Sequence, residues 1–469
     1  MRKCSEIITF GLIAVLLMLS VTGCRTVRQN AGKMLGDTAK ILEDMSDSLQ
    51  DGTASDSSEA VKDAKEEKNM EKEKDSKLNV ETDEAASEEV REGALEESDM
   101  YPEGVPKNGL LFASEMKAGW NLGNTLDAYN GYSYLKDDLS TETYWGNPKT
   151  TQAMMGDIKA AGFSTIRIPV SWHNHMTFMK GASGRYEVKI DESFMDRVQE
   201  IVDWALEEDL FVIINIHHDN DEKYFYPDYA HYDQSMDYVS GVWEAVAQRF
   251  KDYDHRLVFE GLNEPRLVGS PYEWWLNKEE QECLDAVAVI QDLNQIFVDT
   301  VRATGGNNSD RFLGVTSYCA NEDGVLNPDF KLPKDTVEDR IMVAVHAYYP
   351  YNFALQGPGE EGSTDSFSTI RESSTIDIDR LVRKLRERYT MKGIPVYLGE
   401  FGARDKGGNT KDRAACLTYF VSKLRDAKIP YIVWDNGVFS GSGELFGLYD
   451  RRKGTFPEQE VLTALVDNP

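Results

Sequence analysis

The stretch Leu257–Pro265 reads Leu-Val-Phe-Glu-Gly-Leu-Asn-Glu-Pro and predicts a short buried strand that ends in polar residues. Five of its first six residues are apolar or glycine, a composition typical of a strand covered on both faces. Asn263 and Glu264 end the run, and Pro265 prevents the chain from continuing as a central strand. An amide and a carboxylate therefore lie together at the carboxyl end of a strand, the end that carries the chemistry in barrels of parallel strands.

A second stretch, Gly393–Gly402, has the same design and reads Gly-Ile-Pro-Val-Tyr-Leu-Gly-Glu-Phe-Gly. It predicts an apolar strand that ends on Glu400. Hydrolysis of a glycosidic bond uses two carboxyl groups, one that protonates the leaving oxygen and one on the other side of the sugar. Glu264 and Glu400 fit these roles, although either residue taken alone could equally cap a helix or bond a loop. The repetition of the pattern favours the catalytic interpretation.

Eight strand-like segments alternate with helical patterns between residue 105 and residue 469. The strand segments are 118–122, 164–170, 210–216, 257–262, 312–316, 341–345, 395–399 and 431–434, and helices are expected at 151–161, 191–208, 377–389 and 412–427. Such alternation predicts a parallel sheet wound with helices. Eight strands in a segment of this length predict an α/β fold, a single (β/α)8 TIM barrel with enlarged loops over residues 105–469.

Polar, aromatic and ionisable residues gather where these strands end, and we expect them to bind a substrate at one barrel mouth. They are Asn124 after the first strand, Arg167 and His173 at the second, His217 and His218 at the third, Asn263 and Glu264 at the fourth, His346 and Tyr348 at the sixth, Glu400 at the seventh and Trp434 at the eighth. Scattered placement of these side chains along the strands would have argued against a barrel.

Some of these residues allow two interpretations. An arginine inside an apolar strand keeps its charge, so Arg167 needs a buried acidic partner, which a carboxylate at the barrel mouth would supply. Neighbouring strand residues face opposite ways, so we expect His217 to point into the mouth and His218 to pack outward, which argues against a shared zinc ion. Trp434 could belong to the core, but an indole at a barrel mouth also offers an apolar face to a sugar.

Residues 1–23 have the pattern of a lipoprotein signal peptide. Arg2 and Lys3 precede a short apolar run, and Val-Thr-Gly-Cys at 21–24 resembles the lipobox of bacterial lipoproteins, which implies cleavage before Cys24 and lipidation of its sulfur. An ordinary secretory signal cleaved nearby is the alternative. We therefore expect a lipid anchor on Cys24 that holds the protein on the outer face of the cell membrane.

Residues 24–104 predict a disordered acidic linker between this anchor and the barrel. The segment from Arg25 to Met100 contains no Phe, Trp or Tyr, and Asp51–Gly104 holds 19 acidic against 7 basic residues. Such a composition cannot bury enough apolar surface to offset the entropy lost on ordering. The linker could serve as a spacer or be dispensable, and the sequence favours neither interpretation.

Charge and cysteine content argue against several classes of protein. The formal net charge of −30 argues against a nucleic-acid groove. Beyond the leader, Cys283, Cys319 and Cys416 form an odd, widely spaced set that predicts buried small hydrophobes rather than a disulfide framework. The acidic run at 219–222 lacks the spacing of a calcium loop and is expected to be solvated. We expect no metal, no cofactor and a monomer.

Six ordered motifs resemble those of glycoside hydrolase family 5, the cellulase A family. They are GWNLGNTLD (119–127), RIPVSW (167–172), IHHD (216–219), LNEP (262–265), HAY (346–348) and LGEFG (398–402). The likeness is closest to the bacterial endoglucanase subfamily numbered 4, because ETYWGNP (142–148) and VWDNG (433–437) also match it. The resemblance runs from about residue 106 to the C-terminus.

The resemblance implies a retaining, endo-acting hydrolase of β-1,4-linked glucans such as cellulose, mixed-linkage glucan and xyloglucan. Glu264 would be the acid/base, Glu400 the nucleophile, and Asn263 the ligand of the sugar 2-hydroxyl. Arg167 and Tyr348 would hold Glu400 ionised, so we expect a raised pKa for Glu264 and a lowered one for Glu400.

Two other functions remain open at this point. One is a surface lipoprotein that binds glucan without cleaving it, and the other is a β-mannanase or xylanase on the same scaffold, because fold does not determine substrate. The presence of both carboxylates together with Arg167 and Tyr348 argues against the first. The likeness to endoglucanases favours a glucan substrate over mannan or xylan.

Overall fold

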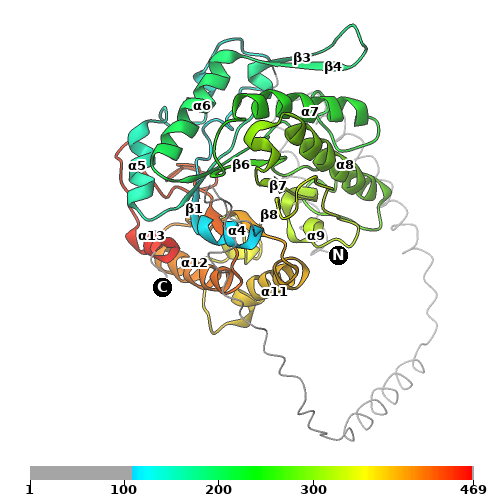
Figure 1. Cartoon of the computed structure of the whole chain (residues 1–469). Coiled ribbons are helices and arrows are strands. Elements are labelled where there is room, and N and C mark those ends of the chain that lie inside the picture. The colour runs from blue at the N-terminus through cyan, green and yellow to red at the C-terminus, as the bar shows by residue number, and fades with distance from the viewer. Residues whose placement is uncertain (1–107, 132, 467–469) are drawn as a thin grey trace, which may run out of the picture. The chain divides into compact units, whose positions relative to one another are not determined.

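The computed structural model of the chain, drawn in Figure 1, describes residues 108–131 and 133–466. The predicted signal peptide, Cys24 and the predicted disordered linker lie outside the described residues.

Eight parallel strands close into a barrel, which confirms the predicted (β/α)8 fold. The strands are β1 (Ala118–Asn121), β2 (Thr165–Ile168), β5 (Phe211–Asn215), β6 (Leu257–Glu260), β7 (Leu313–Val315), β8 (Ile341–His346), β9 (Val396–Phe401) and β10 (Tyr431–Val433). They pair in the order β1-β10-β9-β8-β7-β6-β5-β2, and β1 closes the barrel against β2. Each overlaps one of the predicted strand segments, because an apolar run buried on both faces is a local signal.

Helices surround the barrel, as Figure 1 shows. The α-helices are α4 (Gly109–Met116), α5 (Gln152–Ala160), α6 (Glu192–Glu207), α7 (Tyr232–Arg249), α8 (Gln281–Ala303), α9 (Glu322–Val325), α10 (Tyr351–Ala354), α11 (Glu372–Arg388), α12 (Thr410–Asp426) and α13 (Gln459–Val466). Short 3₁₀ helices lie at Ser140–Thr143, His173–His175, Gly306–Ser309, Tyr318–Ala320 and Thr390–Lys392. The four predicted helices correspond to α5, α6, α11 and α12.

Helix α4 covers the end of the barrel at which the strands begin. A Cβ on its first residue, Gly109, would lie 2.9 Å from the backbone oxygen of Asp339 and 3.0 Å from the ring of Pro395, just before β8 and β9. Phe112 stacks on Phe312 with ring centroids 3.7 Å apart and joins the apolar cluster inside the barrel. This end is therefore packed with hydrophobic side chains, and the opposite mouth is left for polar groups.

An antiparallel hairpin that we did not predict follows β2. Strands β3 (Met176–Lys180) and β4 (Tyr186–Ile190) pair along their whole length and project beyond the helical ring in Figure 1. Arg185, just before β4, donates from Nε to Asp237 of α7 over 2.7 Å and so connects the hairpin to that helix.

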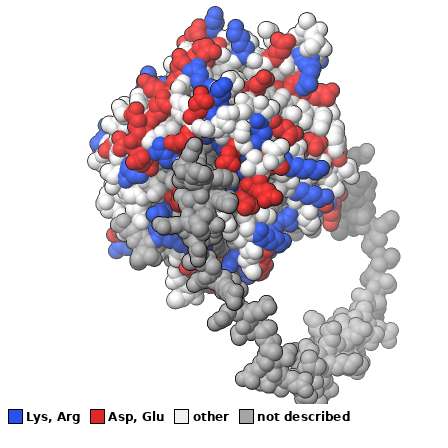
Figure 2. All heavy atoms as spheres, viewed as in Figure 1, with Lys and Arg blue, Asp and Glu red and all other residues white. Residues whose placement is uncertain are grey.

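The outer surface mixes charges of both signs. On the face drawn in Figure 2, acidic and basic side chains are interspersed rather than gathered in a basic groove. Among the described residues, no helix has both the length and the apolar character needed to cross a lipid bilayer.

Candidate active site

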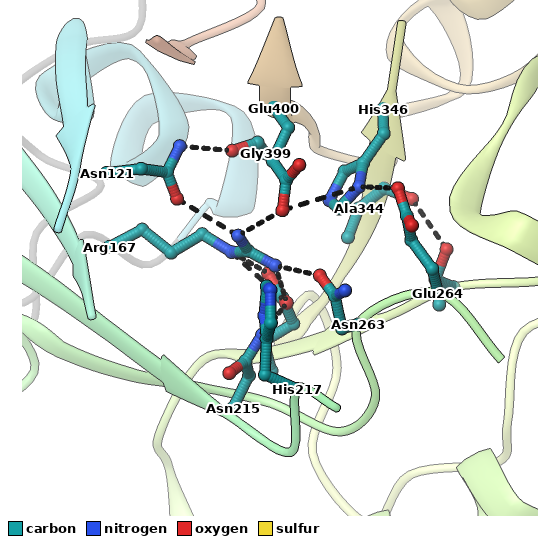
Figure 3. Close-up of polar contacts among 12 residues, drawn as sticks. Asn121, Arg167, Asn215, His217, Asn263, Glu264, Ala344, His346, Gly399 and Glu400 are labelled. Atoms are coloured by element: carbon teal, nitrogen blue, oxygen red, sulfur yellow. Dashed lines mark hydrogen bonds and ion pairs between the residues drawn. The ribbon is translucent and has the colours of Figure 1, made fainter. Parts of the chain in front are cut away.

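Arg167 is the centre of the polar network at the barrel mouth (Figure 3). It extends from β2 with no exposed surface, and its guanidinium donates to Glu260 over 2.6 Å and to Glu400 over 2.8 Å. It also donates to the side-chain oxygens of Asn121 over 3.0 Å and of Asn263 over 2.6 Å. The acidic partner predicted for Arg167 is therefore a pair of carboxylates, one below it in the barrel and one at the mouth.

Glu400 lies at the end of β9 with only 5% of its surface exposed. Its Oε1 accepts from Arg167, and its Oε2 accepts from the hydroxyl of Tyr348 over 2.9 Å. Burial raises the pKa of Glu400 above its ordinary value, and the positive charges of His346 and Arg167 offset that effect only in part. Two donors aimed at its oxygens orient the carboxylate in a single position.

Glu264 lies just beyond β6 and interacts with His346 rather than with Arg167. Its Oε1 lies 2.8 Å from Nδ1 of His346, which is itself 3.7 Å from Oε1 of Glu400. Nε2 of His346 is buried without a partner in the described structure, so a proton on the neutral ring belongs on Nδ1, between the two carboxylates. The pKa of His346 is raised, because Glu400 and Glu264 outweigh the effect of burial.

The expected order of the two carboxyl pKa values is wrong for the substrate-free site. Burial acts against the charged form of Glu264, but the hydrogen bond and charge of His346 lower its pKa below the ordinary value. The pKa of Glu400 is raised instead of lowered. The physical reason is that burial and the negative charge of Glu264 outweigh the effect of Arg167 on Glu400, whereas the hydrogen bond from His346 goes to Glu264.

The two carboxylates are close to each other. One oxygen of Glu264 and one oxygen of Glu400 lie within 4.8 Å, with Nδ1 of His346 within the same distance of both. Carboxyl groups of glycosidases stand about 5–5.5 Å apart in retaining enzymes and about 6.5–9.5 Å apart in inverting ones, which need room for a water molecule. The close approach of the two carboxylates favours the retaining class.

The catalytic pair opens into a cleft of about 600 Å³. The indole of Trp434, only 9% exposed, lines this cleft and lies nearly parallel to the ring of His217, with centroids 5.9 Å apart. A Cβ on Gly123 would lie 2.8 Å from the indole, so only glycine allows this approach of the backbone. The indole thus offers a flat apolar surface beside the carboxylates, and its contact with a sugar stays a prediction.

Both adjacent histidines line the cleft, so the expectation that His218 packs outward is wrong. The chain leaves regular strand geometry after Asn215, which removes the strict alternation of side chains. Burial lowers the pKa of His217 well below its ordinary value, and the charges of His218 and Arg167 act in the same direction. Burial and Arg266 lower the pKa of His218 to about 4, so both rings are neutral at pH 7.

Three predicted substrate-binding residues lie outside the cleft lining, namely Asn124, Arg167 and His173. Arg167 has no exposed surface and contacts Glu400 and Asn263 from beneath the cleft, and the other two lie on loops. His173 is fully buried, with Nδ1 3.1 Å from Asp219, and packs edge-on against Tyr129. Asn124 is half-buried on the loop after β1 with a positive φ of 54°, and its backbone N–H donates to Asp127. We therefore assign both residues to holding the loops rather than to touching substrate.

Asp219 was expected to be solvated, and this is wrong. The residue has no exposed surface, and its Oδ1 accepts from the backbone N–H groups of Trp172 and His173 and from the hydroxyl of Tyr238. It connects the loops after β2 and β5 to helix α7 and so fixes the wall of the cleft.

Sequence reasoning missed the layer of residues beneath Arg167. Glu260 in β6 accepts from Arg167, from Asn215 over 2.9 Å and from the hydroxyl of Tyr397 over 2.7 Å. The positive charge of Arg167 lowers the pKa of Glu260 despite its complete burial. One signal was available, since an acid inside the apolar run Leu-Val-Phe-Glu-Gly required a buried cation.

Two groups of side chains in the described part of the chain could offer ligand atoms to a metal. One is Glu264, His346 and Glu400, and the other is Asp127, His217 and His218. At the first, the Arg167 guanidinium already supplies positive charge 2.8 Å from Glu400. At the second, Asp127 is committed to backbone N–H groups of the β1 loop. We assign no metal to either group.

Comparison with known proteins supports the same interpretation. The family model described as Cellulase (glycosyl hydrolase family 5) matches residues 129–440. Endoglucanase A of Ruminococcus albus is 39% identical over 363 residues, which are 77% of this chain and 93% of that protein. A solved GH5 family lichenase from Caldicellulosiruptor sp. F32 is 48% identical, with a TM-score of 0.74 over 77% of this chain and 95% of that one.

A second solved structure carries a ligand. It is a GH5-4 broad specificity endoglucanase from Ruminococcus champanellensis with bound cellotriose, 39% identical, with a TM-score of 0.69 over 76% of this chain and 98% of that chain. The match therefore covers at least 93% of each of these three proteins.

Proposed function

The chain belongs to glycosyl hydrolase family 5 and is an endo-β-1,4-glucanase, and we propose that Glu400 is the nucleophile and Glu264 the acid/base of a retaining reaction. The observation that carries this proposal is the asymmetry of the pair. Arg167 and Tyr348 both donate to Glu400, whereas Glu264 shares a proton-bearing contact with His346. A carboxylate nucleophile needs hydrogen-bond donors that hold it ionised and oriented, and a general acid needs to carry a proton when the bond breaks.

In the first step, an oxygen of Glu400 attacks the anomeric carbon while the bond from that carbon to the glycosidic oxygen breaks. Glu264 gives its proton to the leaving oxygen, and a glycosyl ester forms on Glu400. In the second step, Glu264 takes a proton from water, the hydroxyl adds to the anomeric carbon, and the carboxylate of Glu400 leaves. Arg167 and Tyr348 stabilise that carboxylate whenever it carries charge.

His346 Nδ1 donates a hydrogen bond to Glu264 Oε1 over 2.8 Å in the free site. A bound sugar displaces water from the cleft and lowers the dielectric, which disfavours the charged form of Glu264. Glu264 then takes up a proton from solvent, and the Nδ1–H of the neutral imidazole stays on His346. While the site is free, the contact between the two residues lowers the pKa of Glu264 and raises that of His346.

Asn263 and Trp434 position the sugar. Arg167 donates to the amide oxygen of Asn263, so the NH₂ group is the part available to a sugar 2-hydroxyl. Such a hydrogen bond strengthens in the transition state and contributes to rate. The indole of Trp434 lies under the apolar face of the ring.

Release of reducing ends by the full-length chain tests the activity and its substrate. We expect release from carboxymethylcellulose and mixed-linkage β-glucan, and loss of that release in Glu400→Ala. Xylan and mannan serve as the comparison polymers, because the barrel alone does not select among them. A folded protein that binds glucan but releases nothing from any polymer would favour a binding lipoprotein instead.

We extend the proposal to the location of the enzyme. The sequence Val-Thr-Gly-Cys at 21–24 supports an acyl anchor on Cys24 and display on the outer face of the cell membrane. Expression of the full chain in a bacterial host, with and without Cys24→Ser, tests it. The wild-type chain should sediment with membranes and the variant should not, and equal distribution would contradict the anchor.

A further inference from the structure

Another cavity lies at the periphery of the fold, where the hairpin of β3 and β4 passes the first turn of α7 (Figure 1). It has a volume of about 410 Å³. Its lining comes from the hairpin, the loop after β5 and the start of α7, and includes Lys180, Tyr186, Tyr229, Tyr232, Asp233 and Gln234. It shares no lining residue with the catalytic cleft, and the hydrolytic steps use none of these side chains.

Tyrosine rings line the cavity from both sides. On the side of the loop and α7, Tyr229 is 58% exposed, and its ring is inclined by 32° to that of Tyr232, with centroids 6.2 Å apart. On the side of the hairpin, Tyr186 stacks on Phe178 with centroids 4.7 Å apart. A tyrosine offers an apolar face and a polar hydroxyl, which together match the apolar CH face and the hydroxyl groups of a sugar ring.

Hydrogen bonds to neighbouring helices hold both sides of the cavity in place. The hydroxyl of Tyr232 donates to Asp292 of α8 over 3.1 Å. The backbone N–H of Tyr186 donates to Asp237 of α7 over 2.8 Å, so the hairpin is fixed beside the helix at the edge of the cavity. Because these rings are positioned before any ligand arrives, little conformational entropy is lost when one binds.

The charges in the lining balance each other. Lys180 pairs with Tyr186 across the hairpin, and its Nζ lies 5.1 Å from the centre of that ring. Asp233 contributes one negative charge, and Gln234 contributes an amide. One cation and one anion beside hydroxyl and amide groups favour a neutral ligand rich in hydroxyls over a charged polymer.

We propose that this cavity is a second binding site for β-glucan, separate from the cleft in which the chain is cleaved. The inference rests on the endoglucanase function, because the polymer that reaches the cleft is the neutral ligand available to the cavity. A polymer held at the cavity stays near the enzyme, which raises its effective concentration at the cleft. The site therefore contributes to the binding of long polymers and not to the cleavage of short oligosaccharides, which occupy the cleft alone.

The test compares a long and a short substrate on the full-length chain. Tyr229→Ala removes the most exposed ring of the cavity, and Ala230→Arg places a long side chain in its lining. In each variant KM for mixed-linkage β-glucan should rise about two- to tenfold at unchanged kcat, as the loss of one aromatic contact implies. Both constants for an aryl cellobioside should stay at the wild-type values. Tyr144→Ala is the matched control, because Tyr144 is 56% exposed and lies outside both linings.

Binding without cleavage gives a second readout. In the Glu400→Ala background, migration through a native gel that contains mixed-linkage β-glucan should be slowed less by the polymer when Tyr229→Ala or Ala230→Arg is added, and Tyr144→Ala should change nothing.

The outcomes separate this inference from the function on which it rests. Unchanged KM for the polymer and unchanged gel retardation in both cavity variants would overturn the second site and leave the endoglucanase function intact. An equal rise in KM for the aryl cellobioside would also overturn it, because the effect would then arise in the cleft. Cleavage of neither substrate by the wild type would overturn the endoglucanase function itself.

Discussion

Removing the hydroxyl of Tyr348 tests how Glu400 is held. Tyr348→Phe deletes the 2.9 Å hydrogen bond to Oε2 of Glu400 and leaves the contact with Arg167. The ring keeps its edge-on packing on Phe446, with centroids 5.5 Å apart, so the fold should be unaffected. A hydrogen bond to a charged group contributes about 1.5–3 kcal/mol, so kcat/KM should fall about 10- to 150-fold.

The pH profile of kcat/KM distinguishes the loss of this hydrogen bond from a general disturbance of the fold. The lost hydrogen bond favoured the ionised form of Glu400, so the pKa of Glu400 rises further in the variant. Because attack requires the anion, the acid limb of the kcat/KM profile should move to higher pH. The assay is reducing-end release from mixed-linkage glucan across the acidic range, with Tyr419→Phe, whose hydroxyl donates to Asp379 outside the cleft lining, as control. An unchanged rate and an unchanged acid limb would refute the assignment.

Further predictions concern the acid, the buried ion pair, the indole and metals. Glu264→Gln should lower kcat on polysaccharide about 10²–10⁴-fold. On an aryl cellobioside with an acidic phenol leaving group, which needs no protonation, kcat should fall much less. Equal falls in kcat on the two substrates would contradict the role of Glu264 as the acid. Glu260→Gln breaks a fully buried ion pair with Arg167 and should lower the free energy of unfolding by about 3–5 kcal/mol. An unchanged midpoint of denaturant unfolding would contradict this expectation. Gly123→Ala places a Cβ 2.8 Å from the Trp434 indole and should raise KM by displacing it, with steady-state kinetics as the check. Treatment with a chelator should leave the rate unchanged, and a loss restored by one added metal would show that a metal takes part.

The strands and the residues at their ends could be predicted because their signals are local. The predicted strand before Asn263 and Glu264 extends to Leu262, whereas β6 ends at Glu260. The predicted strand before Glu400 ends at Gly399, whereas β9 continues to Phe401. The hairpin of β3 and β4 also had a local signal, the alternation Tyr-Glu-Val-Lys-Ile in β4, which the search for buried parallel strands overlooked.

Which of the two catalytic carboxyl groups has the higher pKa could not be predicted from local sequence. It depends on which carboxylate His346 contacts, and His346 lies 82 residues from Glu264 in the sequence. Asp219 was misjudged for a similar reason, because its buried partners belong to the loop after β2 and to α7, 46 residues before it and 19 residues after it. Pairings of this kind are set by packing between distant segments, and no local pattern encodes them.

The assignment of Glu400 as the nucleophile is tested most directly by trapping the glycosyl ester. The full-length chain would be inactivated with a 2-deoxy-2-fluoro-β-cellobioside that carries a good leaving group, then digested and analysed by mass spectrometry. The account predicts a single peptide, containing Glu400, with the mass of one fluorinated cellobiosyl group added. A label on any other residue, or hydrolysis with inverted anomeric configuration and no label, would contradict it.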